Sequence, residues 1–179
     1  DGFIVRGATD IAGLGGDAKY FRAKLSSAVH YKIKENWVLN FGGEVNHIQD
    51  LGEELRINDL FFLGGDNLRG FAVAGVGPRD SSTDDALGGR TLLTSTAELH
   101  FPLGTPEELG FSGALFTDIG TLINPIAEGA QLLDEAGPRV AAGVGVRWRS
   151  PFGPIRIDLA YPILKESFDK EELVSFNFG

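Results

Sequence analysis

The residues of this sequence that could perform acid–base chemistry lie within strand-like segments. Three carboxylates, Glu98, Asp118 and Asp158, could form a set of the kind that hydrolyses glycosidic bonds. The possible bases are three histidines, His30, His47 and His100. These histidines are scattered, and no Ser/His/Asp spacing indicates a catalytic triad. Charge that faces the lumen of a barrel explains the carboxylates more simply, so we expect a protein that is not an enzyme.

The composition excludes several other kinds of chemistry. The chain has 179 residues and no cysteine, which removes disulfides, thiolate metal sites and cysteine nucleophiles. The sequence has neither a phosphate-binding glycine loop nor a cluster of metal ligands, so we expect no cofactor and no metal. Its net charge is −9, from 16 basic and 25 acidic residues. A nucleic-acid partner is not expected, because such binders carry basic patches.

Alternation of apolar and polar residues is the dominant pattern along the chain. In 20–34, Phe21, Leu25 and Val29 point to one face, while Arg22 and Lys24 point to the other. This run is longer than the five or six residues usual for a soluble strand. Weaker or similar alternation occurs in seven further segments: 2–11, 37–49, 90–103, 109–123, 139–149, 154–163 and 172–179. The sequence therefore predicts an all-β chain of about eight antiparallel strands.

Two classes of protein show such alternation, soluble sandwiches and membrane β-barrels, and periodicity alone does not separate them. Connections alternate between short ones and long ones, as in outer-membrane barrels. The short ones are 35–36, 104–108 and 150–153, and the long ones are 12–18, 52–89, 124–137 and 164–171. Aromatic residues near strand ends, and charged residues that recur on one face of the strands, also favour a transmembrane β-barrel. The charged ones are Arg22, Lys24, Lys32, Glu44, Glu98, Asp118, Arg147, Arg149, Arg156 and Asp158.

The connection 52–89 is unusual, because loops of 38 residues are uncommon and are usually functional or disordered. It contains LFFLGGDNLRGF at 60–71 and GVGPRD at 75–80, so it is not of low complexity. Its apolar residues would be unfavourable in water. We therefore expect this loop to fold onto another part of the protein.

The motifs of this loop resemble those of the BamA family of outer-membrane protein assembly factors. GGDNLRGF, GVGPRD and DALGG at 85–89 look like the conserved loop of that family. The likeness continues through TAELHFPLG at 96–104, LFTDIG at 115–120 and GVGVRWRSPFGPIRIDLAYPI at 143–163, and is closest in style to alphaproteobacterial members. TamA and two-partner secretion transporters share the R-G-F and F-x-D-x-G motifs but less of the remainder.

The resemblance implies an insertase that folds β-barrel proteins into the bacterial outer membrane without nucleotide. Family members are sixteen-stranded barrels preceded by periplasmic POTRA domains. Residues 1–179 would be the C-terminal half of such a barrel, with the POTRA domains and the first half absent. The implied partners are outer-membrane lipids, nascent β-barrel proteins and accessory lipoproteins of the assembly complex. The alternatives are a TamA-like or two-partner secretion barrel, or a passive porin-like barrel, which would not need the R-G-F loop.

The resemblance also implies which residues form the functional site. The loop tip would fold back into the barrel, where Arg69 would contact inward-facing residues of the wall. The tip residues are Leu68, Arg69, Gly70 and Phe71, and the wall partners are Glu98, Phe116, Asp118 and Gly120. Val174, Phe176 and Phe178 resemble the last-strand signal recognised during barrel assembly, and are equally explained as the lipid face of any final strand. In the family, the last strand pairs weakly with the first and forms a seam that opens sideways.

An isolated chain of eight strands would have two unpaired edges, each of which tends to pair with another strand. It could close as a narrow eight-stranded barrel, which would expel the loop 52–89 because the interior of such a barrel is filled by side chains. Alternatively, two copies could pair edge to edge. Glycine and charge on the inward faces, in place of bulky side chains, favour self-association.

Overall fold

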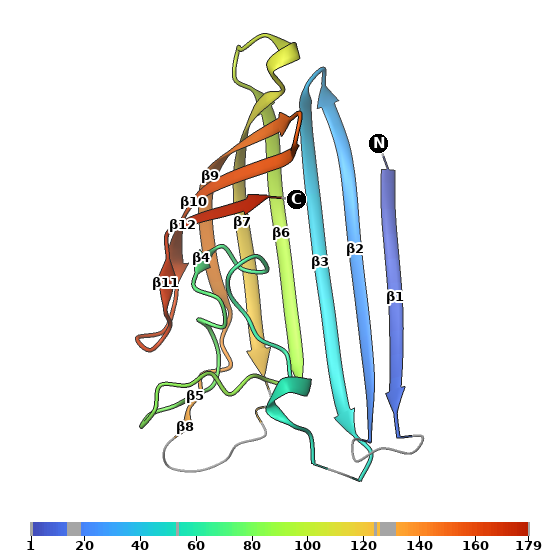
Figure 1. Ribbon diagram of the computed structural model, residues 1–179, viewed down its shortest axis with the longest axis vertical. Coiled ribbons are helices and arrows are strands. Elements are labelled where there is room, and N and C mark those ends of the chain that lie inside the picture. The colour runs from blue at the N-terminus through green and yellow to red at the C-terminus, as the bar shows by residue number, and fades with distance from the viewer. Residues whose placement is uncertain (1, 14–18, 53, 124, 126–131, 179) are drawn as a thin grey trace.

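The fold is built from long antiparallel strands that follow one another along the chain. The computed structural model describes residues 2–13, 19–52, 54–123, 125 and 132–178. Its eight-stranded sheet has the order β1-β2-β3-β6-β7-β9-β10-β12 (Figure 1). The strands are β1 (Gly2–Ala12), β2 (Tyr20–Lys34), β3 (Trp37–Asp50), β6 (Thr91–Pro102), β7 (Phe111–Ile123), β9 (Arg139–Ser150), β10 (Gly153–Leu164) and β12 (Val174–Phe178). The predicted all-β antiparallel class and the number of long strands are confirmed.

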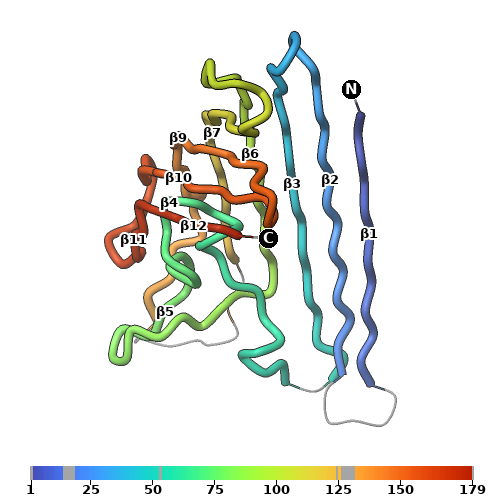
Figure 2. The backbone as a smooth tube through the Cα atoms, turned by 45° about the horizontal axis from the view of Figure 1, so that its top comes forward, coloured from blue at the N-terminus to red at the C-terminus, as the bar shows by residue number. Residues whose placement is uncertain are grey.

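The sheet is curved but not closed. Figures 1 and 2 show β1 at one edge, β12 near the other end, and the segment between β3 and β6 enclosed by the curve. Within the described residues no ladder joins β1 to β12. This chain therefore does not form the narrow closed barrel considered above, and the loop 52–89 is not expelled. Self-association through the free edges stays a prediction.

Two strand ends differ from the sequence prediction because local contacts outweigh the alternation. Residues Glu107–Leu109 form a short 3-10 helix, η2, which is followed by Gly110 in the left-handed conformation, so β7 begins at Phe111 and not at 109. The predicted last strand 172–179 is also divided. Glu171–Glu172 form β11, which pairs with β4 (Gly70–Phe71) of the long loop, and β12 begins only at Val174.

Several sequence-based segments lie partly outside the described residues. The connections 12–18 and 124–137 and the terminal Gly179 are of this kind. A second small sheet, which the sequence did not predict, pairs β5 (Arg79–Asp80) with β8 (Leu132–Leu133). The other helical element is η1 (Ile57–Asp59), and no helix among the described residues is long and apolar enough to cross a membrane.

The face of the sheet that points away from the loop is apolar and exposed. Large hydrophobic side chains on this face come from the first strand to the last: Phe3, Val5, Leu25, Val29, Phe41, Val45, Leu115, Ile119, Val144, Ile157, Leu159 and Phe176. Monomeric soluble proteins rarely expose an apolar surface of this extent. Since the opposite face carries the buried charges, the alternation is that of an outer-membrane barrel wall, not of a soluble sandwich.

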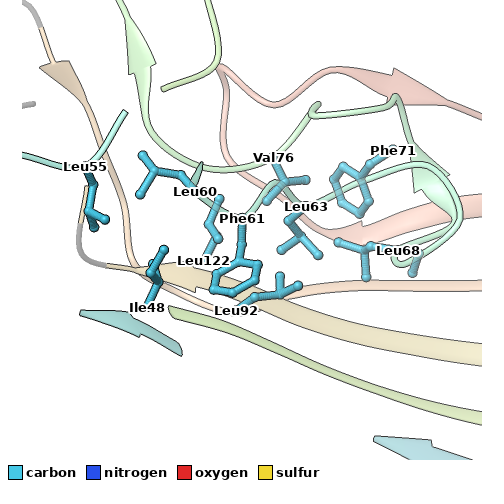
Figure 3. Packing of buried hydrophobic residues seen from close by; sticks show 11 residues of the cluster. Ile48, Leu55, Leu60, Phe61, Leu63, Leu68, Phe71, Val76, Leu92 and Leu122 are labelled. Carbon is cyan, nitrogen blue, oxygen red and sulfur yellow. The ribbon is translucent and has the colours of Figure 1, made fainter. Parts of the chain in front are cut away.

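The hydrophobic core lies between the loop 52–89 and the concave face of the sheet (Figure 3). From the loop it contains Leu55, Leu60, Phe61, Leu63, Leu68, Phe71 and Val76, and from the sheet Ile48, Leu92, Leu122 and Ala141. Ile48, Leu92 and Leu122 sit near the long-loop ends of β3, β6 and β7. At this end the inward positions change from polar to apolar, which gives the loop a surface on which to pack.

Candidate functional site

The tip of the loop is a tight turn that its own side chains stabilise. Asn67 accepts a hydrogen bond from the Gly64 backbone N–H at 2.8 Å through Oδ1, and donates one to the Phe62 carbonyl at 3.0 Å through Nδ2. The Gly65 N–H donates to the Phe71 carbonyl at 2.9 Å, which closes the turn. These bonds fix the direction in which Arg69 leaves the backbone.

Arg69 is buried against the inner wall, with only 5% of its side chain exposed. Its Nε and Nη2 donate to the two carboxylate oxygens of Asp118 at 2.7 and 2.8 Å, and its Nη1 donates to Glu98 Oε2 at 2.5 Å. Thr96 Oγ1 donates to Asp118 at 2.6 Å, and the guanidinium carbon lies 3.5 Å from the centre of the Phe116 ring. This paired, bidentate geometry is the strong form of the arginine–carboxylate interaction.

The carboxylate of Glu98 belongs to a wider network than the motif suggests. Its Oε1 lies 2.5 Å from His100 Nε2 and accepts hydrogen bonds from Arg147, the shorter from Nη2 at 2.9 Å. Arg147 also donates to Asp158 at 2.5 Å, and Arg156 Nε lies 3.2 Å from the other oxygen of Asp158. Ion pairs between inward-facing side chains thereby connect strands β6, β9 and β10.

Each buried carboxylate of the network has a guanidinium partner, which offsets the cost of burying its charge. Three guanidinium groups face three carboxylates, namely Arg69, Arg147 and Arg156 against Glu98, Asp118 and Asp158. Burial alone would lower the pKa of Arg69, but the hydrogen bonds and charges of Asp118 and Glu98 outweigh it and raise that pKa above its usual value. Arg69 therefore carries a fixed positive charge in the site. No group of three metal-ligating side chains occurs within the described ranges.

Among the other predicted residues, the glycines leave space for the close approach of loop and wall, and the apolar tip residues pack into the core. Leu68 and Phe71 are buried in the core, on either side of the Arg69–Gly70 pair (Figure 3). Gly120 lies close beneath the loop: a Cβ atom at this position would be only 3.0 Å from Leu63 Cδ1. Gly70 has a φ of +91°, and a Cβ atom there would lie 3.1 Å from the Cβ of Ala141. Small side chains on the wall thus let the loop backbone approach closely.

We expect Gly70→Ala to unseat the loop tip, because the new side chain meets both an unfavourable φ and a filled space. The cost should be about 1–3 kcal/mol, the range for a strained backbone residue. Limited proteolysis of the loop in the full-length protein measures it as faster cleavage. Gly104→Ala is the matched control, since Gly104 also has a positive φ, +78°, but has open space around it. Equal cleavage rates in the two variants would contradict the expectation.

The last-strand residues are not part of this inner site. Val174, Phe176 and Phe178 are 58–65% exposed on the outward face of β12, where they pair with Leu159, Ile157 and Ile155 of β10. The site residues therefore form two groups, an anchor inside the curve of the sheet and an apolar row outside it. The sequence analysis missed Arg147 and Asp158 as partners of the anchor, although it placed both on the inward face.

Comparison with known proteins agrees with this geometry. The family model described as the Omp85 superfamily domain matches residues 1–179. The chain is 34% identical over 177 residues to the outer membrane protein assembly factor BamA of Neorickettsia risticii, which covers 98% of this chain and 24% of that protein. It is 25% identical over 205 residues to BamA of Neisseria meningitidis, covering 99% of this chain and 26% of that protein.

Two further relatives extend the comparison to other membranes and to a solved structure. Outer envelope protein 80, chloroplastic, of Arabidopsis thaliana is 32% identical over 130 residues, or 68% of this chain and 14% of that protein. The crystal structure of BamA from Haemophilus ducreyi lacking POTRA domains 1–3 superposes with a TM-score of 0.84 at 23% identity, covering 98% of this chain and 37% of that chain. The chain thus spans about a quarter of the length of the BamA proteins it matches.

Proposed function

Because this chain belongs to the Omp85 superfamily, we propose that it is the C-terminal barrel region of a protein that folds and inserts β-barrel proteins into the bacterial outer membrane. The observation that carries the proposal is the buried anchor. A passive porin-like barrel would not need a long loop that Arg69, Asp118 and Glu98 fix on the inner wall. The BamA relatives are named as assembly factors of outer membrane proteins.

In the whole protein, residues 1–179 are the last eight strands of a sixteen-stranded barrel. The open sheet supports this, since no described strand pairs with the outer edges of β1 and β12 and a β-sheet in lipid must have its edges paired. The greater length of the relatives leaves room for the first barrel half and for POTRA domains before it. Lipids contact the apolar outward face, and accessory lipoproteins complete the assembly complex.

The seam at the last strand performs the insertion. β12 pairs with β10 through five residue pairs and has its other backbone edge free within the described residues. Unmade backbone hydrogen bonds are costly in lipid, so an incoming client strand that adds to this edge gains stability by β-augmentation. This pairing releases free energy by itself, and no nucleotide is needed. Val174, Phe176 and Phe178 present the last-strand signal to the membrane side.

The test is a client-folding assay with the full-length protein, including its POTRA domains, in liposomes. An unfolded β-barrel client is added without nucleotide, and its folded fraction is followed by heat-modifiable mobility on a gel. We expect folding at least about tenfold faster than in empty liposomes, a difference of 1.4 kcal/mol in the barrier. A rate equal to that in empty liposomes would reject the insertase and favour the porin-like alternative. Acceleration only of secreted passenger segments would favour a translocation barrel.

A further inference from the structure

The last strand β12 is the strand of the main sheet with the shortest backbone pairing. Among the described residues the ladder joins Val174–Phe178 to β10, with one further bond of 2.8 Å from the Ala160 N–H to the Leu173 carbonyl, whereas β10 pairs with β9 from Gly153 to Leu164. A strand so short depends on contacts other than its own ladder. Among the described residues the long loop supplies such contacts at both ends of β12.

The first contact precedes the strand. β4 of the loop, which contains Gly70 and Phe71, pairs with β11, which contains Glu171 and Glu172. Two backbone hydrogen bonds of 2.9 Å extend this pairing, from the Ala72 N–H to the Lys170 carbonyl and from the Lys170 N–H to the Gly75 carbonyl. β4, β11 and β12 lie together in both views of the backbone (Figures 1 and 2). The residue after Arg69, Gly70, is thus paired with the segment that leads into the last strand.

The second contact is near the end of the strand. Asn177 points to the inward face of β12, where its Nδ2 lies 3.2 Å from both carboxylate oxygens of Asp66. Arg156, the partner of Asn177 on β10, donates to the same carboxylate at 3.2 Å. Asp66 therefore binds across the β10–β12 pair. It stands three residues before Arg69, so both contacts are within a few residues of the buried anchor.

We propose that the loop tip is a clamp on the last strand, in which Asp66 and the β4–β11 ladder hold β12 against β10 while Arg69 is seated on the wall. The proposal rests on the insertase function above and adds how its seam is regulated. When Arg69 leaves Asp118 and Glu98, both contacts are withdrawn together because they belong to the same turn. By linkage, a client strand that displaces β12 also weakens the seating of the loop. Asp66 is a positioning residue, since it acts through the strand and not on the client.

Amide hydrogen exchange of the full-length protein in lipid nanodiscs tests the clamp. In Asp66→Ala we expect the amides of 174–178 to exchange roughly two- to fivefold faster, the effect of losing one exposed charged contact. Peptides from β6 and β7 should exchange as in the wild type, because the anchor itself is intact. Asp80→Ala is the matched control, since the Asp80 carboxylate lies in the same loop and its hydrogen bonds to described residues go to the nearby Ser82 and Thr83.

The outcomes separate the clamp from the function on which it rests. Wild-type exchange of 174–178 in Asp66→Ala, or equal acceleration in Asp80→Ala, would overturn the clamp. The same wild-type preparation is also assayed for client folding. The wild-type protein could fail to fold clients while Asp66→Ala, but not Asp80→Ala, speeds the exchange of β12. The insertase function would then be wrong, and the contact between loop and strand would be confirmed.

Discussion

Arg69→Ala in the full-length protein is expected to release the loop 52–89 from the barrel wall and to remove most of the insertion activity. Glu98 keeps Arg147 as a partner, whereas Asp118 loses the guanidinium that binds both of its oxygens. A buried carboxylate without its partner costs about 3–5 kcal/mol. A penalty of this size is enough to reverse the seating of a single loop, so we expect the loop to be seated in only a minority of molecules.

Two measurements detect this loss. Cells that depend on the variant should grow slowly and contain lower levels of outer-membrane proteins, and the loop should be cleaved rapidly in limited proteolysis. Arg69→Lys should be intermediate, because an ammonium keeps the charge but cannot bind Asp118 through two parallel bonds. Arg56→Ala is the control, since Arg56 is an exposed arginine of the same loop. Normal growth, normal protein levels and wild-type cleavage in Arg69→Ala would together disprove the role of the anchor.

The fold was predictable from sequence because its signal is long and regular. An alternation of 14 or 15 residues, as in β2 and β3, defines both the strand and the side chains that share a face, whereas the weaker alternation of β1 defined them less well. The ends of strands were less predictable because they depend on single contacts, such as the turn at Gly110 and the pairing of Glu171 with the loop. Two-residue ladders such as β4–β11 contain no periodicity at all.

The site was predictable in part, for reasons that lie in its geometry. The strand phases placed Glu98 and Asp118 inward, and the R-G-F motif pointed to Arg69. The contact from Arg147 to Glu98 could not be derived, because it crosses β7, and only the folded sheet shows which long side chain reaches over a neighbouring strand. The docking surface of the loop did leave a signal. Leu92–Leu93 and Leu122–Ile123 are apolar on both faces, which a strand shows when both faces are covered.

Arg139→Met is expected to cause a loss of stability comparable to that of the anchor variant, at a second buried ion pair. Arg139 and Asp169 have side chains 2% and 0% exposed, and Nε donates to Oδ2 at 2.7 Å. Nη1 also donates to the carbonyls of Glu135 and Gly137, both at 2.7 Å. Removal of the guanidinium leaves the Asp169 carboxylate buried without a cation, at a cost of about 3–5 kcal/mol. Since Asp169 precedes Lys170, the loss should also loosen the segment that leads into β12.

Most of this cost should come from the unpaired charge, which a second substitution can test. In Arg139→Met/Asp169→Leu the carboxylate is gone as well, so we expect more than half of the lost stability to return in urea unfolding of the full-length protein in detergent micelles. The stability that does not return reflects three lost hydrogen bonds. Two are donated by Arg139 to the carbonyls of Glu135 and Gly137, and one is donated by the Glu166 N–H to Asp169. Arg90→Met is the matched control, because the Arg90–Asp50 pair is 27% and 33% exposed and should contribute at most about 1 kcal/mol. If Arg139→Met destabilised the protein no more than Arg90→Met, burial would not be what makes the Arg139–Asp169 pair costly to break.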